Sequence, residues 1–170
     1  MRIAFLGNYQ IKKGSEVFAR LVTKMTKMGT ENLFYILGPI GDEKSWQKIK
    51  TKIVKQYPYD NADLAQIFQR EEIDLVIVPS IWPETFMMTF FQAAQSQMPI
   101  IAPKLGFPYY FLRDENYPLF FKNEAELENL IISLTEEKLT LAKNILAKKM
   151  DGDFWKKTEV QFDLLGNMLE

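Results

Sequence analysis

The chain has 170 residues, of which 47% are hydrophobic and 25% are charged, and its net charge is −1 at pH 7. These proportions are typical of one compact soluble domain with a substantial core, and they leave little room for a second domain. Lys and Arg are scattered along the chain and balanced by Asp and Glu. The basic stripe of a nucleic-acid-binding protein is therefore missing, and we expect no nucleic-acid partner.

Two residue types are missing altogether, which restricts the chemistry of the chain. The sequence contains neither cysteine nor histidine. Disulfides, thiolate nucleophiles, Cys-ligated zinc and Ser-His or Cys-His catalytic pairs are therefore excluded within the chain. The sequence also lacks a signal-peptide pattern and any run of about 18 apolar residues, so we expect no transmembrane segment and a cytoplasmic location.

Short apolar runs alternate with helix-length amphipathic segments, a pattern typical of βαβ units around a parallel sheet. The predicted strands are Ile3–Leu6, Leu33–Leu37, Thr51–Val54, Asp74–Val78, Pro99–Ala102 and a short sixth at Leu119–Phe121. Several of them lack polar alternation, as strands covered by helices on both faces do. The sequence therefore predicts one α/β domain, residues 1–170, with a Rossmann-like three-layer αβα architecture and about six parallel strands.

Helices are predicted from apolar residues at helical spacing and from their capping residues. Candidate N-caps stand at Ser15, at Asp60 or Asn61, and at Asn123. Gly29 is placed to end the first helix. The segment Thr85–Gln97 is apolar nearly all round, which predicts a buried helix. From Glu136 to Glu170 the sequence predicts a helical tail with a break near Asp151–Asp153.

In a doubly wound sheet, ligands bind beyond the carboxyl ends of the strands. Gly7 ends the first predicted strand, and Lys12-Lys13-Gly14-Ser15 leads into the first helix. A flexible turn, two ammonium groups and free backbone N–H groups at a helix start would suit an anionic phosphate. The spacing matches neither the P-loop nor the dinucleotide-binding motif, so an ordinary solvated turn is the alternative interpretation.

A second candidate segment follows the predicted strand Asp74–Val78. Glu84 lies in a loop containing Pro and Trp, just before the apolar helix. A carboxylate in that place can accept hydrogen bonds from sugar hydroxyls, or it can simply stabilise the start of the helix. Gln92, about two helical turns later, is predicted to point to the same side, with a backbone-bonded core glutamine as the alternative.

The stretch from Asp74 to Gly106, DLVIVPSIWPETFMMTFFQAAQSQMPIIAPKLG, resembles the signature of the family 4 retaining glycosyltransferases, which have the GT-B fold. That signature contains a strand, Pro-Ser, a loop with Glu, a helix with a second Glu and a glycine-containing turn. Upstream, IAFLGNYQIKKGSEVF and FYILGP resemble the first two strands of the family and their turns. The resemblance covers residues 3–135.

The resemblance implies roles for particular residues in binding a nucleoside-diphosphate sugar. Lys13 would meet the diphosphate, and backbone amides of Thr85 and Phe86 would approach the sugar or phosphate. Glu84, the implied catalytic residue, would meet the donor sugar. The implied donor-binding set is Gly7, Asn8, Lys13, Gly14, Thr85, Phe86, Gln92 and Gly106. No cofactor or metal is expected, because Lys13 and backbone amides would meet the phosphate charge.

Two positions depart from the family pattern. Asn8 stands where the family usually has an arginine, and Gln92 stands where it has its second glutamate. An amide makes weaker hydrogen bonds to a ribose diol than a carboxylate, and Lys13 alone does not replace a bidentate arginine. Weaker donor binding, an altered donor or a degenerate site would each follow from these departures.

The resemblance thus implies the carboxy-terminal, donor-binding half of a retaining glycosyltransferase of polysaccharide or glycoconjugate biosynthesis. Its partner would be an amino-terminal acceptor-binding domain, and the full enzyme would associate peripherally with membranes. The isolated chain is expected to be inactive in transfer.

Two rival hypotheses remain open at this point. One is a degenerate, non-catalytic GT-B-like domain that acts as an interaction or assembly module, suggested by Asn8 and Gln92. It is also suggested by aromatic residues that look exposed: Phe107, Tyr109, Tyr110 and Phe111. The other is an unrelated flavodoxin-like binding domain.

Overall fold

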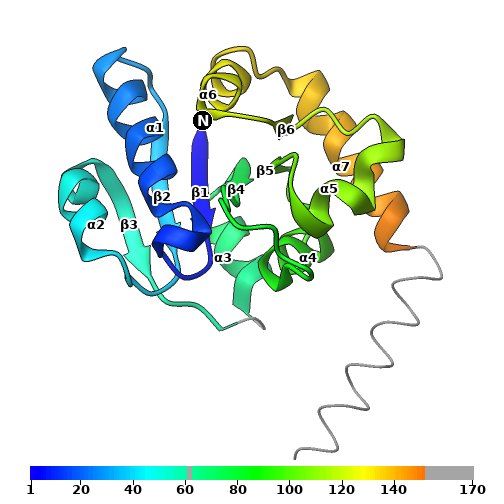
Figure 1. Ribbon diagram of the computed structural model, residues 1–170, viewed down its shortest axis with the longest axis horizontal. Helices are drawn as coiled ribbons and strands as arrows, with labels where there is room; N and C mark the ends of the chain where they lie inside the picture. The colour runs from blue at the N-terminus through cyan, green and yellow to red at the C-terminus, as the bar shows by residue number, and fades with distance from the viewer. Residues whose placement is uncertain (61–62, 152–170) are drawn as a thin grey trace, which may run out of the picture.

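Six parallel strands form the central sheet, in the order β3-β2-β1-β4-β5-β6. The computed structural model describes residues 1–60 and 63–151 (Figure 1). The strands are β1 (Arg2–Leu6), β2 (Leu33–Leu37), β3 (Ile53–Tyr57), β4 (Leu75–Ile77), β5 (Ile100–Pro103) and β6 (Phe120–Phe121). The chain adds β2 and β3 on one side of β1 and then β4, β5 and β6 on the other, which is the order of a doubly wound sheet. The predicted Rossmann-like sheet of about six parallel strands is confirmed.

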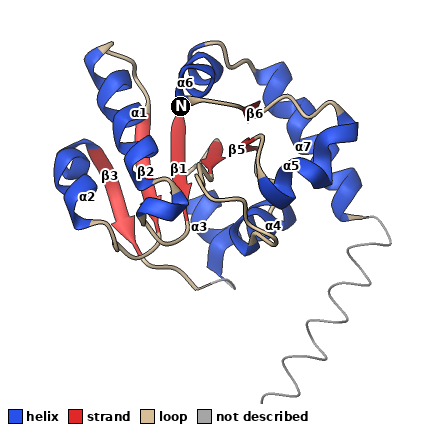
Figure 2. Ribbon diagram, viewed as in Figure 1, coloured by secondary structure: helices blue, strands red, loops and turns tan. Residues whose placement is uncertain are grey.

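Helices cover both faces of this sheet. The α-helices of the described residues are α1 (Ser15–Lys27), α2 (Glu43–Ile49), α3 (Leu64–Arg70), α4 (Met88–Gln95), α5 (Gly106–Leu112), α6 (Glu124–Ile132) and α7 (Glu136–Met150). α1 contacts α2 and α6, whereas α4 contacts α3 and α7. The two groups lie on opposite sides of the strands, which gives the predicted three-layer architecture (Figure 2).

The core is built around β1, which is almost completely buried from Ile3 to Leu6. Phe5 packs edge-to-face against Tyr9 and Phe18, with ring centroids 5.1 and 5.4 Å apart. Phe34 on β2 continues the cluster, 6.0 Å from Phe18. Such contacts contribute beyond the apolar area they bury. They anchor the end of β1 and the start of α1, between which the predicted phosphate-binding turn lies.

The predicted helix termini are partly confirmed. Asn123 caps α6 by accepting a hydrogen bond from the Glu126 N–H, 2.9 Å, and Gly29 follows α1 with a φ of 69°. Ser15 is not an N-cap, because Gly14 holds that position and Ser15 is the first residue of the helix. Its hydroxyl is instead bonded to Asp42.

The predicted N-cap of α3 and the predicted end of α7 lie next to residues that the structure does not describe. Asp63 precedes α3, so Asp60 is not its cap, and Asn61 lies outside the described residues. α7 begins at Glu136 as predicted and ends at Met150, just before the predicted break. The rest of the predicted tail, residues 152–170, lies outside the described residues.

The third strand starts later than predicted, at Ile53 instead of Thr51, and extends to Tyr57. The 3₁₀ turn η2 (Lys50–Lys52) continues α2 and occupies the predicted start of the strand. α2 itself was not predicted. Because β3 is a half-exposed edge strand, its apolar pattern is too weak to show its limits.

α4 also starts later than predicted, at Met88 instead of Thr85. The carbonyl of Glu84 accepts a hydrogen bond from the Phe107 N–H, 2.9 Å, which holds the preceding loop away from helical geometry. Met88 and Gln95 are exposed, so the prediction that this helix is buried is wrong at its first and last residues.

A buried polar cluster fastens the start of α1 to the start of α2. The hydroxyl of Ser15 donates to Asp42 Oδ2, 2.5 Å, and Ser45 donates to Asp42 from its hydroxyl and its N–H. The Tyr9 hydroxyl donates to the Ser15 carbonyl, 2.9 Å, and burial raises the pKa of Tyr9 to about 12. Burial alone would raise the pKa of Asp42, but the hydrogen bonds from Ser15 and Ser45 outweigh it and lower that pKa.

We expect Asp42→Ala to lower the free energy of unfolding at pH 7 by about 1–3 kcal/mol, because a helix N-cap is lost and buried hydroxyls lose their acceptor. A carboxyl with a lowered pKa stabilises the fold fully above its unfolded-state pKa of about 4, and this contribution is lost as pH falls through the folded-state value. The difference from wild type should therefore shrink below about pH 4. Urea unfolding at several pH values measures both effects.

The matched control is Glu43→Ala, which removes an exposed carboxylate from the first turn of the same helix. It should change the free energy of unfolding by less than about 0.5 kcal/mol. Equal losses for the two variants, or a loss for Asp42→Ala that does not depend on pH, would contradict the role given to the cluster.

Candidate functional site

The structure brings the two predicted ligand-binding segments together at the carboxyl edge of the sheet. One is the turn after β1, which contains the 3₁₀ helix η1 (Ile11–Lys13). The other is the loop after β4, where the Ile81 N–H and the Ser80 hydroxyl both donate to the Lys12 carbonyl, at 3.2 and 3.1 Å. Ser80 thus ties the segments to each other, a role that was not predicted from the sequence.

An ion pair lies at the centre of this junction. Lys13 Nζ donates to Glu84 Oε2 at 2.6 Å, with the lysine side chain 38% exposed and the glutamate side chain 13% exposed. The second oxygen, Glu84 Oε1, is buried and has no hydrogen-bond partner in the part of the chain that the structure describes. Buried acceptors normally have a donor. This oxygen is therefore suited to a hydroxyl group brought by a ligand.

The start of α5 fixes the backbone of Glu84. Besides the hydrogen bond from Phe107, Gly106 packs directly against the Glu84 peptide, where an added Cβ would lie 2.8 Å from its N and O atoms. Gly106 also has a φ of 66°, which an L side chain rarely adopts. The structure therefore places Gly106 as a support for Glu84, and its predicted contact with a ligand stays a prediction.

Gly14 makes the corresponding close contact on the other side. Its φ is 84°, and an added Cβ would lie 1.9 Å from the Pro79 carbonyl oxygen. The N–H groups of Lys13, Gly14 and Ser15 already donate to the carbonyls of Gln10 and Ile11. The expectation that free N–H groups in this turn bind phosphate is wrong for these three, and the phosphate contact of Lys13 stays a prediction.

The remaining predicted residues after β1 lie close to the turn. The Gly7 N–H donates to the Leu37 carbonyl at the end of β2, 2.9 Å. Asn8 is half-buried, and among the described residues its Oδ1 has no hydrogen-bond partner. An added Cβ at Gly41 would lie 3.0 Å from that oxygen, so the Asn8 amide points toward the loop after β2.

An aromatic cluster holds the loop that carries Glu84. Phe86 stacks on Phe91 of α4, with ring centroids 4.6 Å apart, and lies 5.7 Å from Phe107. Phe107 in turn stacks on Phe111, 5.7 Å away. Thr85, between Glu84 and Phe86, is exposed. The ring of Phe86 therefore positions the loop, which leaves its backbone as the part suited to a ligand.

Of the aromatic residues that the sequence suggested were exposed, only Tyr110 is. Phe107 and Phe111 belong to the cluster around Phe91, and Tyr109 is half-buried against Phe120, 5.4 Å away. The expectation of an exposed aromatic surface on α5 is therefore wrong for three of its four residues.

Gln92 has a partner that was not predicted. The Tyr59 hydroxyl, just past the end of β3, donates to Gln92 Oε1 at 3.2 Å. Burial raises the pKa of Tyr59 to about 12, so the hydroxyl stays a donor at neutral pH. The helical argument that placed Gln92 beside Glu84 is wrong, because α4 begins only at Met88. The sign in the sequence that points to Tyr59 is its position just after a strand end.

Two cavities open at this carboxyl edge. One, of about 400 Å³, lies beside the ends of β4 and β5 and is lined by Val17, Pro79, Ser80, Ile81, Pro103, Lys104, Leu105, Phe121, Lys122, Asn123 and Glu124. The other, of about 370 Å³, lies at the end of β3 and is lined by Tyr57, Pro58, Tyr59, Asp60, Asp63, Gln66, Ile67 and Arg70. The edge thus offers concave surface on both sides of the two loops.

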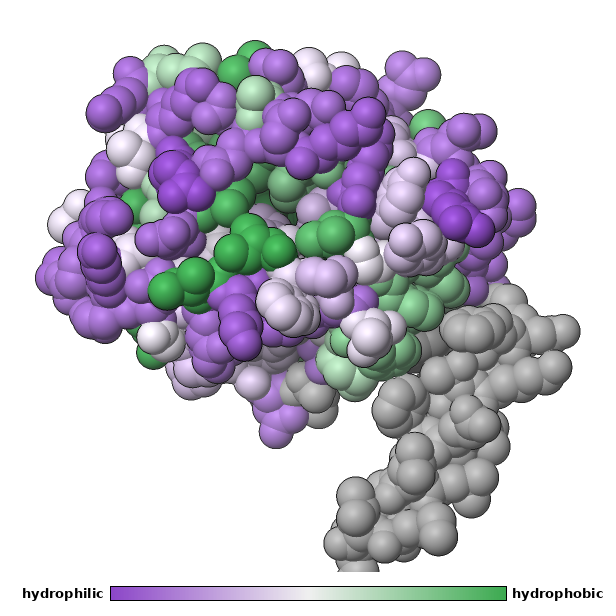
Figure 3. Space-filling view, in the orientation of Figure 1, coloured by the Kyte–Doolittle hydropathy of each residue, from purple (hydrophilic) through white to green (hydrophobic). Residues whose placement is uncertain are grey.

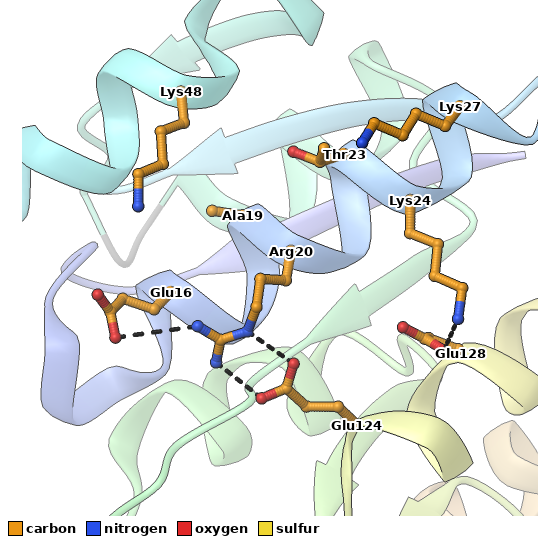
Figure 4. A pocket seen from close by; sticks show the side chains of 9 residues that line it. All are labelled: Glu16, Ala19, Arg20, Thr23, Lys24, Lys27, Lys48, Glu124 and Glu128. Carbon is orange, nitrogen blue, oxygen red and sulfur yellow. Dashed lines mark hydrogen bonds and ion pairs between the residues drawn. The ribbon is translucent and has the colours of Figure 1, made fainter.

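A further cavity, of about 450 Å³, lies away from these loops, between α1, α2 and α6 (Figure 4). Most of its charges are already paired. Arg20 donates twice to Glu124, both at 2.7 Å, and Lys24 is bonded to Glu128. These ion pairs join α1 to α6. Like the two cavities at the carboxyl edge, this cavity is lined by none of the predicted site residues.

Exposed apolar side chains occur in the same segments as Lys13 and Glu84 and at the start of α4. Ile11, Ile81, Trp82 and Met88 are each about half exposed or more, and we call these four residues the apolar rim. The ammonium of Lys12 lies 5.4 Å from the centre of the Trp82 ring. Figure 3 shows hydrophobic surface running across the middle of the molecule between hydrophilic residues.

Comparison with known proteins identifies the family. The sequence model of the group 1 glycosyl transferases matches residues 1–137. The chain belongs to the group 1 glycosyltransferases. No curated protein sequence matches it.

Several solved structures resemble this group 1 glycosyltransferase. The C-terminal domain of the group 1 protein LpcC from Francisella tularensis is 17% identical, with a TM-score of 0.69, and the match covers 90% of this chain and 85% of that one. S. aureus TarM, solved with UDP, is 15% identical, with a TM-score of 0.76 and coverage of 96% and 34%. Anabaena HepE, solved with UDP and glucose, is 17% identical, with a TM-score of 0.66 and coverage of 88% and 43%.

At these identities the similarity establishes the fold, which is that of the C-terminal domain of a GT-B glycosyltransferase, as the sequence predicts. The chain spans less than half the length of TarM and HepE. Within residues 1–60 and 63–151, no helix is both long and apolar enough to cross a membrane.

Metal binding stays untested. Among the described residues, no three acidic side chains gather as a metal site would require. The Asp-x-Asp spacing that can hold a metal does occur in this group 1 glycosyltransferase, at Asp151-Gly152-Asp153. Asp151 follows α7 instead of a strand end, and residues 152 and 153 lie outside the described part. The expectation of a metal-free site therefore remains a prediction.

We expect Gly14→Ala to lower the free energy of unfolding by more than about 2 kcal/mol, because it adds a clash with the Pro79 carbonyl to the cost of left-handed backbone. Gly29→Ala is the matched control, since Gly29 has a similar φ of 69° but nothing within 4 Å of an added Cβ. It should cost only about 1–2 kcal/mol. Urea unfolding compares the two, and equal costs would show that the contact with Pro79 relaxes.

Proposed function

We propose that the chain is the donor-binding domain of a retaining glycosyltransferase and binds a nucleoside-diphosphate sugar at the carboxyl edge of its sheet. The observation that carries this proposal is the meeting of Lys13 and Glu84 at 2.6 Å in a member of the group 1 glycosyltransferases. A cation suited to a diphosphate and an acceptor suited to sugar hydroxyls lie side by side there. HepE, which shares the fold, was solved with UDP and glucose.

In the proposed complex, each residue has a distinct task. The ammonium of Lys13 stabilises the charge that develops on the departing diphosphate, as fixed positive groups do in transfer reactions. Glu84, the proposed catalytic residue, accepts hydrogen bonds from the donor sugar. Gly7 and Gly14 allow the turn after β1 to approach the phosphate closely. The backbone of Thr85 and Phe86 faces the sugar or phosphate.

The acceptor is proposed to bind to a second, amino-terminal domain. The match covers 34% of TarM and 43% of HepE, so most of the length of those proteins has no counterpart in this chain. The apolar rim beside the ion pair suits contact with such a domain, because exposed apolar patches at a site mark interaction surfaces. Polysaccharide or glycoconjugate synthesis in the cytoplasm, with peripheral membrane association of the full enzyme, is the proposed setting.

A degenerate domain that serves as an interaction module is the second candidate. It is favoured by Asn8 and Gln92, which depart from the family pattern, and by the hydrogen bond that Tyr59 already makes to Gln92. Calorimetric titration with nucleoside diphosphates and their sugar conjugates separates the candidates, since only the donor-binding function requires specific binding.

Lys13→Ala should weaken binding of a nucleoside diphosphate by up to about ten- to a hundredfold, because a charge-assisted contact to phosphate is lost. Binding of the bare nucleoside should change little. Lys12→Ala removes the same charge from the neighbouring residue, whose ammonium lies over Trp82, and is the matched control. Calorimetry with both ligands measures this, and equal losses for nucleoside and diphosphate would show that Lys13 has another role.

Gln92→Glu should strengthen binding of a ribonucleotide, because a carboxylate makes stronger hydrogen bonds to a ribose diol than an amide does and still accepts from Tyr59. The gain should disappear with the 2′-deoxy ligand. Calorimetry with both ligands, together with thermal unfolding, measures the effect. In a degenerate site the new carboxylate would only lower the stability of the protein through desolvation. An unchanged ribonucleotide affinity would contradict a functional donor site at Gln92.

A further inference from the structure

We propose that Glu84 is an internal competitor of the diphosphate for Lys13, which makes the site prefer the sugar-bearing donor over the bare nucleoside diphosphate. The inference rests on the proposed function, because it assumes that Lys13 meets phosphate. It assigns Glu84 a role in selecting between substrate and product, in addition to its contact with the sugar.

The first argument is the direct pairing of the two charges. Lys13 Nζ and Glu84 Oε2 are 2.6 Å apart, so each charge neutralises the other. A diphosphate that binds to Lys13 must compete with this carboxylate. A ligand therefore gains only the difference between the two contacts, and not the full strength of a bond between ammonium and phosphate.

The second argument concerns which partner can move. Glu84 is the more buried of the two, at 13% exposed against 38% for Lys13. Its carbonyl accepts from the Phe107 N–H, and Gly106 packs against its peptide. Lys13 has a long, partly exposed side chain with three rotatable donors. When a ligand enters, we expect Lys13 to swing to the phosphate while Glu84 stays in place.

The third argument is the state of Glu84 after Lys13 has left. Its Oε1 has no partner among the described residues even in the ion pair, so the loss of Lys13 leaves both carboxylate oxygens unsatisfied. A buried charge without a partner is strongly unfavourable, and a diphosphate nearby adds repulsion. Sugar hydroxyls supply the missing donors. The bare diphosphate supplies no such donors, so the complex with the product alone keeps an unsatisfied Glu84 carboxylate.

The consequence is a site that favours release of its product. Once the sugar has been transferred, the nucleoside diphosphate is left beside an unsatisfied Glu84. The return of Lys13 to the carboxylate then re-forms the ion pair, and this return opposes rebinding of the product. Release of product limits the turnover of many enzymes, so such a device has a direct use.

Calorimetry with Glu84→Gln tests the inference. The ligands are UDP, GDP and ADP with the corresponding glucose conjugates, and the pair that binds most tightly is used for comparison. We expect the wild type to prefer the sugar conjugate, and the bare diphosphate to bind Glu84→Gln about tenfold more tightly than wild type, because the competing charge is gone. The affinity for the sugar conjugate should rise by less or should fall. The preference for the sugar conjugate over the bare diphosphate should therefore become smaller or reverse.

Glu128→Gln is the matched control. It removes the same charge from a carboxylate of similar exposure, 19%, that is paired with Lys24 away from the site. It should leave both affinities unchanged, and thermal unfolding of each variant verifies that it is folded.

The outcomes separate the two proposals. If Glu84→Gln lowers the affinity for both ligands, or leaves the affinity for the bare diphosphate unchanged, Glu84 does not compete with the diphosphate. The proposed donor site then stands without this competition. If the wild type binds a sugar conjugate but no bare diphosphate, and a bare diphosphate binds Glu84→Gln, the competition is supported in its strongest form. If neither protein binds any of the ligands, the proposed function falls and the inference falls with it.

Discussion

The contact between Gly14 and the Pro79 carbonyl is the constraint on which the candidate site depends. It lets the turn after β1 lie directly against the end of β4, so that the ends of two neighbouring strands carry one surface. A side chain at Gly14 would separate them by the width of a methyl group. The hydrogen bonds from Ser80 and Ile81 to the Lys12 carbonyl, and the ion pair between Lys13 and Glu84, all require that the turn lies this close.

Both charges of the ion pair are placed by backbone more than by side-chain packing. Lys13 ends a 3₁₀ turn in which its own N–H donates to the Gln10 carbonyl, and Glu84 lies in a loop held by α5 through Phe107. The aromatic stack of Phe86 on Phe91 adds a hydrophobic anchor just after Glu84. A ligand that replaces the ion pair therefore meets a framework that is already formed, which reduces the entropy lost on binding.

The sheet was predictable from the sequence because its central strands are unbroken apolar runs, such as Val76 to Val78. The predicted limits of the edge strand β3 are wrong because Val54 and Lys55 are exposed. The apolar pattern of this segment therefore does not distinguish the strand from the 3₁₀ turn before it. The sequence predicts a helix from Thr85 onward. The loop there is not helical because the Phe107 N–H, from a distant segment, binds the Glu84 carbonyl. Tyr59 and Ser80 were missed for the same reason: their partners, Gln92 and Lys12, lie far away in sequence.

The two departures from the family pattern have a common electrostatic property. Asn8 stands where the pattern has a cation and Gln92 stands where it has an anion, so together they remove one charge of each sign. The site keeps Lys13 and Glu84, and these two neutralise each other. A lone buried charge is penalised whichever sign it has, so the loss of one charge of each sign costs less than the loss of either alone. The Tyr59 hydroxyl already donates to the Gln92 side-chain oxygen, so a ribose hydroxyl that binds there must share this acceptor with Tyr59.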